Sequence, residues 1–181
     1  MFSLNVLSAI ALQTLITSAL AGQAIIQNNC GYQVTVLSTS TNNQATVGAG
    51  STFTEPLNGH ASLKIARDPS GLWAHGITQF EYSVADTLWY DISLIDCTNG
   101  NDASGCPGHE AGITMTASGG DCAVANCPPG AFCPDQAYFV WNDDLATKSC
   151  KPGQTGGDIT MTLCSGGGGR VKRGIAGRVE Y

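Results

Sequence analysis

Eight cysteines constrain this 181-residue chain more than any other feature, because all of them follow an uncharged apolar segment at the amino terminus. An even number of cysteines behind such a segment is typical of a secreted chain whose cysteines pair as disulfides. Zinc is the alternative, but the chain has no Cys-x-x-Cys pair and its three histidines are not spaced as ligands. We therefore expect disulfides, and neither a metal nor another cofactor. The cysteines are Cys30, Cys97, Cys106, Cys122, Cys127, Cys133, Cys150 and Cys164.

The apolar segment, residues 3–21, ends in Ala19-Leu20-Ala21, a small-x-small pattern that suits signal peptidase. A membrane anchor is the alternative, but a span needs about 20 strongly apolar residues. Gln13 and several serines and threonines interrupt the apolar run here. We expect a signal peptide over residues 1–21, with Ala24 as another cleavage point. The mature product is then secreted and has no membrane segment.

The charges are divided unevenly along the chain. Four of the eight basic residues lie in the last twelve positions, whereas thirteen of the fourteen acids precede them. The body of the chain is therefore strongly acidic, which argues against nucleic acid or an anionic membrane as a partner. We expect a monomer whose partner is another kind of extracellular molecule.

The carboxyl-terminal residues 166–181 form a separate unit, a Gly-rich linker followed by a basic tail. Lys172-Arg173 is the kind of site that dibasic proteases of the secretory pathway cut, so cleavage after Arg173 is one expectation. An unprocessed basic tail is the other. In both cases the fold is expected to lie within residues 22–165.

Short runs of β-branched and aromatic residues alternate with turn signals along that domain, without a convincing amphipathic helix. This pattern predicts an all-β antiparallel sandwich. Residues 38–50 are expected to form a loop, and disulfides are expected to hold residues 98–134. The expected strands are residues 24–28, 32–37, 51–55, 61–67, 77–84, 88–95, 112–116, 136–141 and 158–164.

The segment 88–96 carries two acids on a strongly predicted strand. Alternation places Asp91 on the face opposite Tyr90 and Ile92, but places Asp96 on their face. Both acids reach one surface only if a bulge or the end of the strand intervenes. Trp89 is out of phase with Tyr90, so it is predicted to lie on the solvent side of the sandwich.

Several short motifs follow one another in order along residues 24–165. They are IIQNNCGY (25–32), IAR (65–67), FEY (80–82), YDISLID (90–96), CPD (133–135), AY (137–138), DD (143–144) and TMTLC (160–164). With the cysteines, they make the chain resemble the thaumatin-like superfamily. Within it the chain is most similar to the small fungal secreted branch of the Blastomyces yeast-phase-specific protein and CetA-like proteins.

This resemblance implies a flattened β-sandwich and a disulfide pattern. The implied pairs are Cys30–Cys164, Cys97–Cys106, Cys122–Cys150 and Cys127–Cys133. Cys30–Cys164 would tie the terminal strands together and would have the largest effect on stability.

The resemblance also implies an acidic cleft, whose five residues fall on Arg67, Glu81, Asp91, Asp96 and Asp143. Glu81 and Asp91 are the candidate general acid and base for a glycosidic bond, which for inversion requires a separation of roughly 6.5–9.5 Å. Arg67 would hold the ionised carboxylate or a sugar hydroxyl. The same residues are equally open to interpretation as a structural charge network.

One departure argues against catalysis. In the larger relatives a long insertion between the equivalents of Cys127 and Cys133 builds the second wall of the cleft. Here five residues separate these cysteines. A groove with one wall removed buries less sugar and excludes less water.

Other aromatic and histidine residues are secondary candidates. His60, His75 and His109 are expected to be loop residues rather than ligands. Trp73, Trp89 and Trp141 offer flat apolar faces that suit a sugar ring.

We therefore expect a secreted protein without enzymatic activity, located at the cell wall or in the extracellular space, that engages wall polysaccharide such as β-glucan. The alternatives are a weak endo-β-1,3-glucanase that uses Glu81 and Asp91, and a secreted antigen or effector that binds a host or microbial protein.

Overall fold

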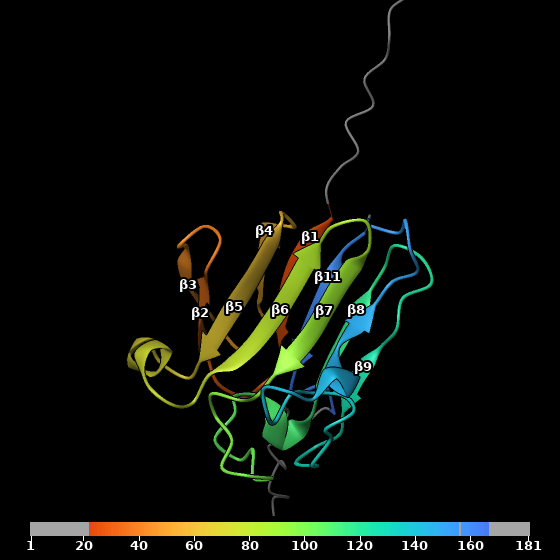
Figure 1. Ribbon diagram of the computed structural model, residues 1–181. Coiled ribbons are helices and arrows are strands. Elements are labelled where there is room, and N and C mark those ends of the chain that lie inside the picture. The colour runs from red at the N-terminus through yellow and green to blue at the C-terminus, as the bar shows by residue number, and fades with distance from the viewer. Residues whose placement is uncertain (1–21, 156, 167–181) are drawn as a thin grey trace, which may run out of the picture.

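Two β-sheets pack face to face in the computed structural model, which describes residues 22–155 and 157–166 (Figure 1). The predicted signal segment and the tail after Gly166 lie outside these residues. One sheet has five strands in the order β4-β1-β11-β8-β9, and the other has six in the order β10-β7-β6-β5-β2-β3. The strands are β1 (Gln23–Asn28), β2 (Val34–Ser38), β3 (Gln44–Val47), β4 (Thr52–Pro56), β5 (His60–Ala66), β6 (Thr78–Val84), β7 (Leu88–Ser93), β8 (Ile113–Ala117), β9 (Ala125–Cys127), β10 (Lys148–Ser149) and β11 (Ile159–Leu163).

The core lies between the sheets and is filled by alternate residues of the strands. Ile26 and Met161 of the five-stranded sheet and Leu63, Phe80 and Ile92 of the six-stranded sheet are fully buried. Most of their neighbours along each strand are polar and more exposed, as a half-buried strand requires. The predicted all-β sandwich is confirmed.

The terminal strands hold the five-stranded sheet together. β1 and β11 pair in parallel, from Ala24 opposite Ile159 to Asn28 opposite Leu163, whereas the other ladders of both sheets are antiparallel. The sandwich is therefore antiparallel with one parallel pair, which the sequence did not predict. The Cys30–Cys164 disulfide closes this pair just beyond its end.

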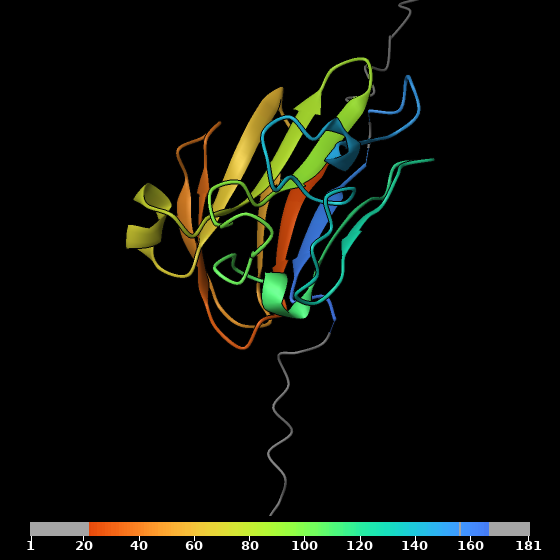
Figure 2. The same ribbon diagram turned by 60° about the horizontal axis from the view of Figure 1, so that its bottom comes forward.

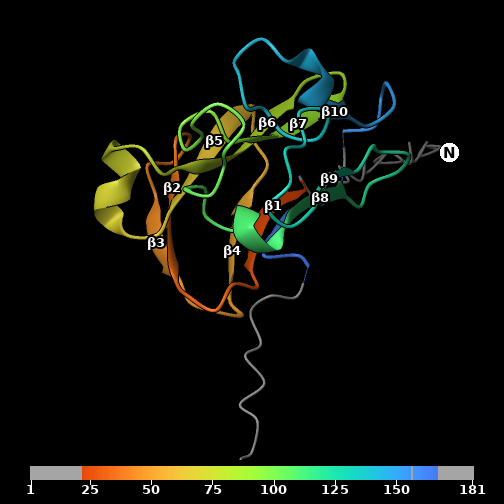
Figure 3. The same ribbon diagram turned by 90° about the horizontal axis from the view of Figure 1, so that it is seen from below.

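All four expected disulfides are confirmed. Besides Cys30–Cys164, the structure contains Cys97–Cys106, Cys122–Cys150 and Cys127–Cys133, and no described cysteine is free. Seen from below in Figure 3, the chain between β7 and β8 gathers at one end of the sandwich. Figure 2 shows the same end brought forward.

Two local predictions are wrong. Residues 38–50 were expected to form a loop but include β3, whose short polar sequence pairs with β2 at the edge of the sheet. Residues 136–141 form no strand, because only Tyr138 bridges to Ser93 of β7. The Tyr138 N–H donates to Ile92 O, and its carbonyl accepts from Leu94 N. Tyr138 alone therefore provides hydrogen-bond partners for the backbone at the end of β7 before the chain turns away.

The helical elements among the described residues are three short 3₁₀ turns, η1 (Pro69–Trp73), η2 (His109–Ala111) and η3 (Asp144–Ala146). The Asp68 carboxylate caps η1 by accepting from the backbone N–H groups of Ser70 and Gly71. Across the described part of the chain, no helix is long and apolar enough to cross a membrane.

The disulfides predict unequal losses of stability. The double substitution Cys30→Ser with Cys164→Ser opens a loop whose ends are 134 positions apart in the sequence. Cys127→Ser with Cys133→Ser opens a loop whose ends are 6 positions apart. Loop-closure entropy gives losses of about 5 and about 2 kcal/mol in the free energy of unfolding, respectively. Urea denaturation of both double variants measures the difference, and equal losses would contradict the proposed role of the terminal pair.

Candidate functional site

The outer face of the six-stranded sheet carries rows of polar side chains that the strand register sets side by side. This sheet lies in front of the other in Figure 1. Across β5, β6 and β7, Ser62 lies opposite Glu81, and Glu81 lies opposite Asp91. Because Tyr82 and Tyr90 point into the core, their neighbours Glu81 and Asp91 point to the outer face.

The two carboxyl groups form a coupled pair. Burial first, and then the nearby Glu81 carboxyl group, raise the pKa of Asp91 from 3.8 to about 7. Burial also raises the pKa of Glu81, although the Lys64 ammonium and the Ser93 hydroxyl oppose this shift. Direct contact between carboxylates disfavours two charges at once. The pair therefore holds a proton at mildly acidic pH.

Asp96 reaches the same face because β7 ends at Ser93, three residues earlier. Its carboxylate lies 3.9 Å from Lys64 Nζ and accepts from Gln79 Nε2 at 3.2 Å. The end of the strand thus resolves the conflict that strict alternation created for Asp91 and Asp96.

Asp143 lies at the start of η3 and is linked to this face through Lys148 of β10. The charges of Asp135, Asp143 and Asp91 act on the Lys148 ammonium, whose pKa is lowered by burial against their opposing effect. Lys148 Nζ also donates to the backbone carbonyls of Asp135 and Leu145. Four of the five expected cleft residues, Glu81, Asp91, Asp96 and Asp143, thus belong to one electrostatic group.

The structure places Arg67 elsewhere. Its Nη2 donates to Glu110 Oε1 at 2.8 Å, and its guanidinium stacks 3.7 Å above the ring of Tyr32. The Tyr32 hydroxyl donates to the same Glu110 oxygen at 2.6 Å and accepts from Gly108 N. Burial and the bond to Glu110 raise the pKa of Tyr32 to about 12.

This Arg67 cluster pins η2 to the turn after β1 and lies apart from the carboxylate pair. The positive charges at the acidic face come instead from Lys64 and Lys148. The sequence did not single out either lysine, although Lys64 lies between Leu63 and Ile65 on a strongly alternating strand. No alternating pattern marks Lys148 in the sequence, because its strand, β10, has only two residues.

A hollow of about 460 Å³ opens on the outer face beside the carboxylate pair. Trp89 forms part of its wall with 48% of its surface exposed, which confirms its predicted solvent-side position. The hollow is lined by Thr39, His60, Ala61, Ser62, Glu81, Tyr82, Ser83, Trp89, Tyr90 and Asp91. None of these residues comes from 98–134, so that region supplies no second wall.

The other aromatic and histidine candidates lie away from this hollow, with the exception of His60. Trp73 in η1 and Trp141 before η3 are 80% and 83% exposed. His75 is exposed in a loop. His109, which was expected to be a loop residue, is buried in η2 with 2% of its surface exposed, because it packs edge-on against Phe139.

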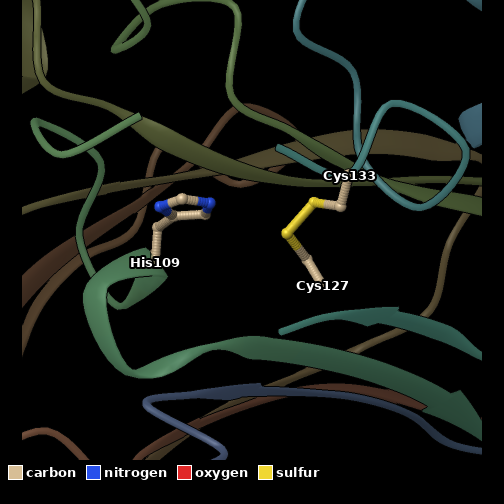
Figure 4. A group of neighbouring side chains, drawn as sticks. All are labelled: His109, Cys127 and Cys133. Carbon is tan, nitrogen blue, oxygen red and sulfur yellow. A yellow bond between two sulfur atoms is a disulfide. The ribbon is translucent and has the colours of Figure 1, made fainter. Parts of the chain in front are cut away.

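His109 also belongs to a group that could hold a metal. Among the residues that the structure describes, ligand atoms of His109, Cys127 and Cys133 lie within 4.8 Å of one another (Figure 4). The two cysteines are joined as a disulfide, and disulfide sulfurs lack the thiolate charge that zinc and copper prefer.

The separation of the two carboxyl groups on the acidic face bears on whether it could hydrolyse a glycosidic bond. An inverting glycosidase keeps its two carboxyl groups roughly 6.5–9.5 Å apart to admit a water, and a retaining enzyme roughly 5–5.5 Å. Glu81 and Asp91 are direct cross-strand neighbours, and the Cβ atoms of such a pair lie about 4.5–5.5 Å apart. Carboxyl groups of this kind can accept hydrogen bonds from the hydroxyl groups of a ligand.

Comparison with known proteins identifies the family of the chain and solved structures that resemble it. The family described as Bys1, Blastomyces yeast-phase-specific protein, matches residues 11–165. The crystal structure of the protein elicitor MoHrip2 from Magnaporthe oryzae superposes with a TM-score of 0.58 and 23% identity, over 80% of this chain and all of that one. The thaumatin-like xylanase inhibitor TLXI matches less well, with a TM-score of 0.46 and 14% identity over 76% and 97% of the two chains. No curated protein sequence matches.

The raised pKa of Asp91 predicts a pH-dependent stability. Between 3.8 and about 7 the folded protein keeps a proton that the unfolded chain releases, so the free energy of unfolding falls as the pH rises through this window. Below the window both states are protonated, and above it neither is. Asp91→Asn should flatten the decrease in urea-denaturation midpoint between pH 4 and about pH 7.

The matched control for this prediction is the exposed Asp86→Asn, which should leave the pH profile of wild type intact. A steep profile that survives in Asp91→Asn would show that another group carries the proton.

Proposed function

Since this chain belongs to the family of the Blastomyces yeast-phase-specific protein, we propose that it is a secreted protein that binds extracellular polysaccharide of the β-glucan type without cleaving it. The location is the cell wall or the surrounding medium. The observation that carries this proposal is the hollow on the outer sheet face, where Trp89 stands beside the Glu81–Asp91 pair.

Two features support secretion. Four disulfides tie the described residues together, and disulfides of this kind persist in oxidising compartments outside the cytosol. The apolar segment that ends in Ala19-Leu20-Ala21 has the pattern of a cleaved signal peptide.

The hollow combines the two contacts that sugars use. A pyranose has an apolar face that stacks on an aromatic ring, and Trp89 offers such a ring to solvent. Its hydroxyls donate to carboxylates and exchange hydrogen bonds with hydroxyl side chains. Glu81 and Asp91 provide the carboxylates, and Ser62 and Ser83 provide hydroxyls on the same surface.

The proposal excludes hydrolysis because of the geometry of the pair. Glu81 and Asp91 are direct cross-strand neighbours on the same face of the sheet, so they project from one wall and not from opposite sides of a bound sugar. The open side of the hollow also admits bulk water, which weakens the electrostatic stabilisation that a transition state needs. Binding with weak to moderate affinity is the function that this surface fits.

Sedimentation with insoluble β-1,3-glucan, and with chitin as a second polysaccharide, tests this function. Wild type should be retained by glucan, and Trp89→Ala and Glu81→Gln should each weaken retention by about tenfold, because a stacking or charged contact is worth roughly 1–2 kcal/mol. Arg67→Ala is the matched control and should bind as wild type does, since its guanidinium contacts Glu110 and Tyr32.

An assay of reducing ends on soluble β-1,3-glucan accompanies the binding test. Release of reducing ends that is lost in Glu81→Gln would overturn the non-catalytic assignment.

Retention by neither polysaccharide would favour a second candidate, a secreted effector that binds a protein. The loop before β10 offers an apolar surface for such a partner, because Val140, Trp141 and Leu145 are 52%, 83% and 75% exposed. Substitution of Trp141 by Ala then becomes the variant of interest.

A further inference from the structure

The loop of residues 135–145, which leads into β10, exposes three large apolar side chains. Val140, Trp141 and Leu145 are 52%, 83% and 75% exposed, and Trp141 is the most exposed large apolar residue that the structure describes. Exposed apolar groups that gather in one place mark interaction surfaces, whereas single ones are ordinary. We call this segment the Trp141 loop. It contributes no residue to the hollow beside Trp89, so it is a separate surface.

Hydrogen bonds fix the Trp141 loop near both of its ends. Lys148 Nζ donates to the backbone carbonyls of Asp135 and Leu145 at 2.6 and 2.9 Å. Between them, the backbone of Tyr138 pairs with the end of β7, and the Tyr138 hydroxyl contacts the hydroxyl of Thr147. A loop that is already ordered loses little conformational entropy when another segment binds to it.

Three carboxylates share the loop with these apolar side chains. Asp135 and Asp144 are exposed, and Asp143 is half-buried. Among the described residues, none of the three forms an ion pair with a basic side chain. The surface is therefore both apolar and acidic, and its best complement is a segment that alternates apolar and basic side chains.

The chain itself contains such a segment in residues 167–181, which lie outside the described part of the structure. Between Cys30 and Gly166 the chain has four basic residues and thirteen acids, so no segment there offers this combination. The basic residues of the tail are Arg170, Lys172, Arg173 and Arg178, and its larger apolar residues are Val171, Ile175, Val179 and Tyr181.

The described chain ends close to the Trp141 loop. The N–H of Gly166, the last described residue, donates to the carbonyl of Ala111 in η2. In the same turn His109 packs edge-on against Phe139, the residue before Val140, with ring centroids 6.2 Å apart. Fifteen extended residues span about 50 Å. A domain of this length has a radius of gyration of only about 15 Å, so the tail can reach the loop.

We propose that the Trp141 loop is the docking site of this chain's own basic tail, residues 167–181. A short linker gives the tail an effective concentration of about 1 mM, so a dissociation constant of about 0.1 mM keeps it docked about nine-tenths of the time. An outside segment of equal affinity has no such advantage. The docked tail covers Trp141 and excludes other proteins from the loop, and loss of the tail opens it. This contact is independent of the proposed glucan binding.

Limited digestion of the full-length protein with trypsin tests the proposal at low ionic strength. Trypsin cuts after the tail's arginines and lysine, mass spectrometry measures the rate of tail loss, and this rate follows the undocked fraction. Trp141→Ala should lose the tail about tenfold faster than wild type, because the undocked fraction rises from about one-tenth to nearly all. Trp73→Ala is the matched control, since Trp73 is 80% exposed in η1, and it should lose the tail at the wild-type rate.

The acidic part of the surface has its own test. The double variant Asp143→Asn with Asp144→Asn should lose the tail about threefold faster than wild type, because exposed charge pairs contribute little each. High salt should speed tail loss in wild type by a similar factor, since it screens these pairs. Asp86→Asn removes an exposed acid elsewhere and should have no effect.

Circular dichroism checks that each variant keeps the wild-type fold. Equal rates of tail loss in wild type and Trp141→Ala would overturn the proposal, and so would equal acceleration by Trp73→Ala. Docking within one molecule is independent of protein concentration. Faster tail loss on dilution of wild type would therefore show that the tail binds a second copy, which also contradicts the proposal.

Discussion

The parallel pairing of the first strand with the last is the interaction on which the rest of the structure depends. β1 continues the five-stranded sheet toward β4, and β11 continues it toward β8 and β9, so this one ladder joins the two halves of the sheet. The contact spans almost the whole domain and carries a large loop-closure cost, which the Cys30–Cys164 disulfide removes from the unfolded state. The acidic face and the disulfide-rich end both need the closed sandwich to keep their segments in place, and the β1–β11 pair closes that sandwich.

The acidic face is built from a different kind of contact. β5, β6 and β7 follow one another along the chain and pair as consecutive antiparallel strands, so Glu81 and Asp91 meet through local register. The charged groups that affect the pKa values of this pair lie outside β5–β7. They include Lys148 of β10 and Asp96 of the turn after β7. Neighbouring strands thus bring the two carboxyl groups together, and the positive charges of Lys64 and Lys148 lie near them. This combination explains how a carboxyl pair can stay partly buried on an outer face.

The end of the sandwich that holds the chain between β7 and β8 is stabilised by disulfides and polar contacts and not by a second core. Arg67, Tyr32 and Glu110 join η2 to the turn after β1, and the buried His109 packs between Phe139 and the Cys127–Cys133 disulfide. Each contact joins segments that have little apolar surface of their own. This end therefore depends on its crosslinks and polar contacts more than on apolar packing.

The sequence by itself determined the sandwich, its strongly alternating strands and, through the family resemblance, the disulfide pairing, because the period of two and the cysteines are written into the chain. It also determined that Trp89 faces solvent and that Glu81 and Asp91 share one region. Only the tertiary structure decided that Arg67 turns to Glu110, that Lys64 and Lys148 face the acids, and that His109 lies beside a disulfide. The same holds for β3, β10 and the parallel pair. The physical reason is that these contacts join short or irregular segments, whose partners are selected by packing across the closed sandwich and not by any local pattern.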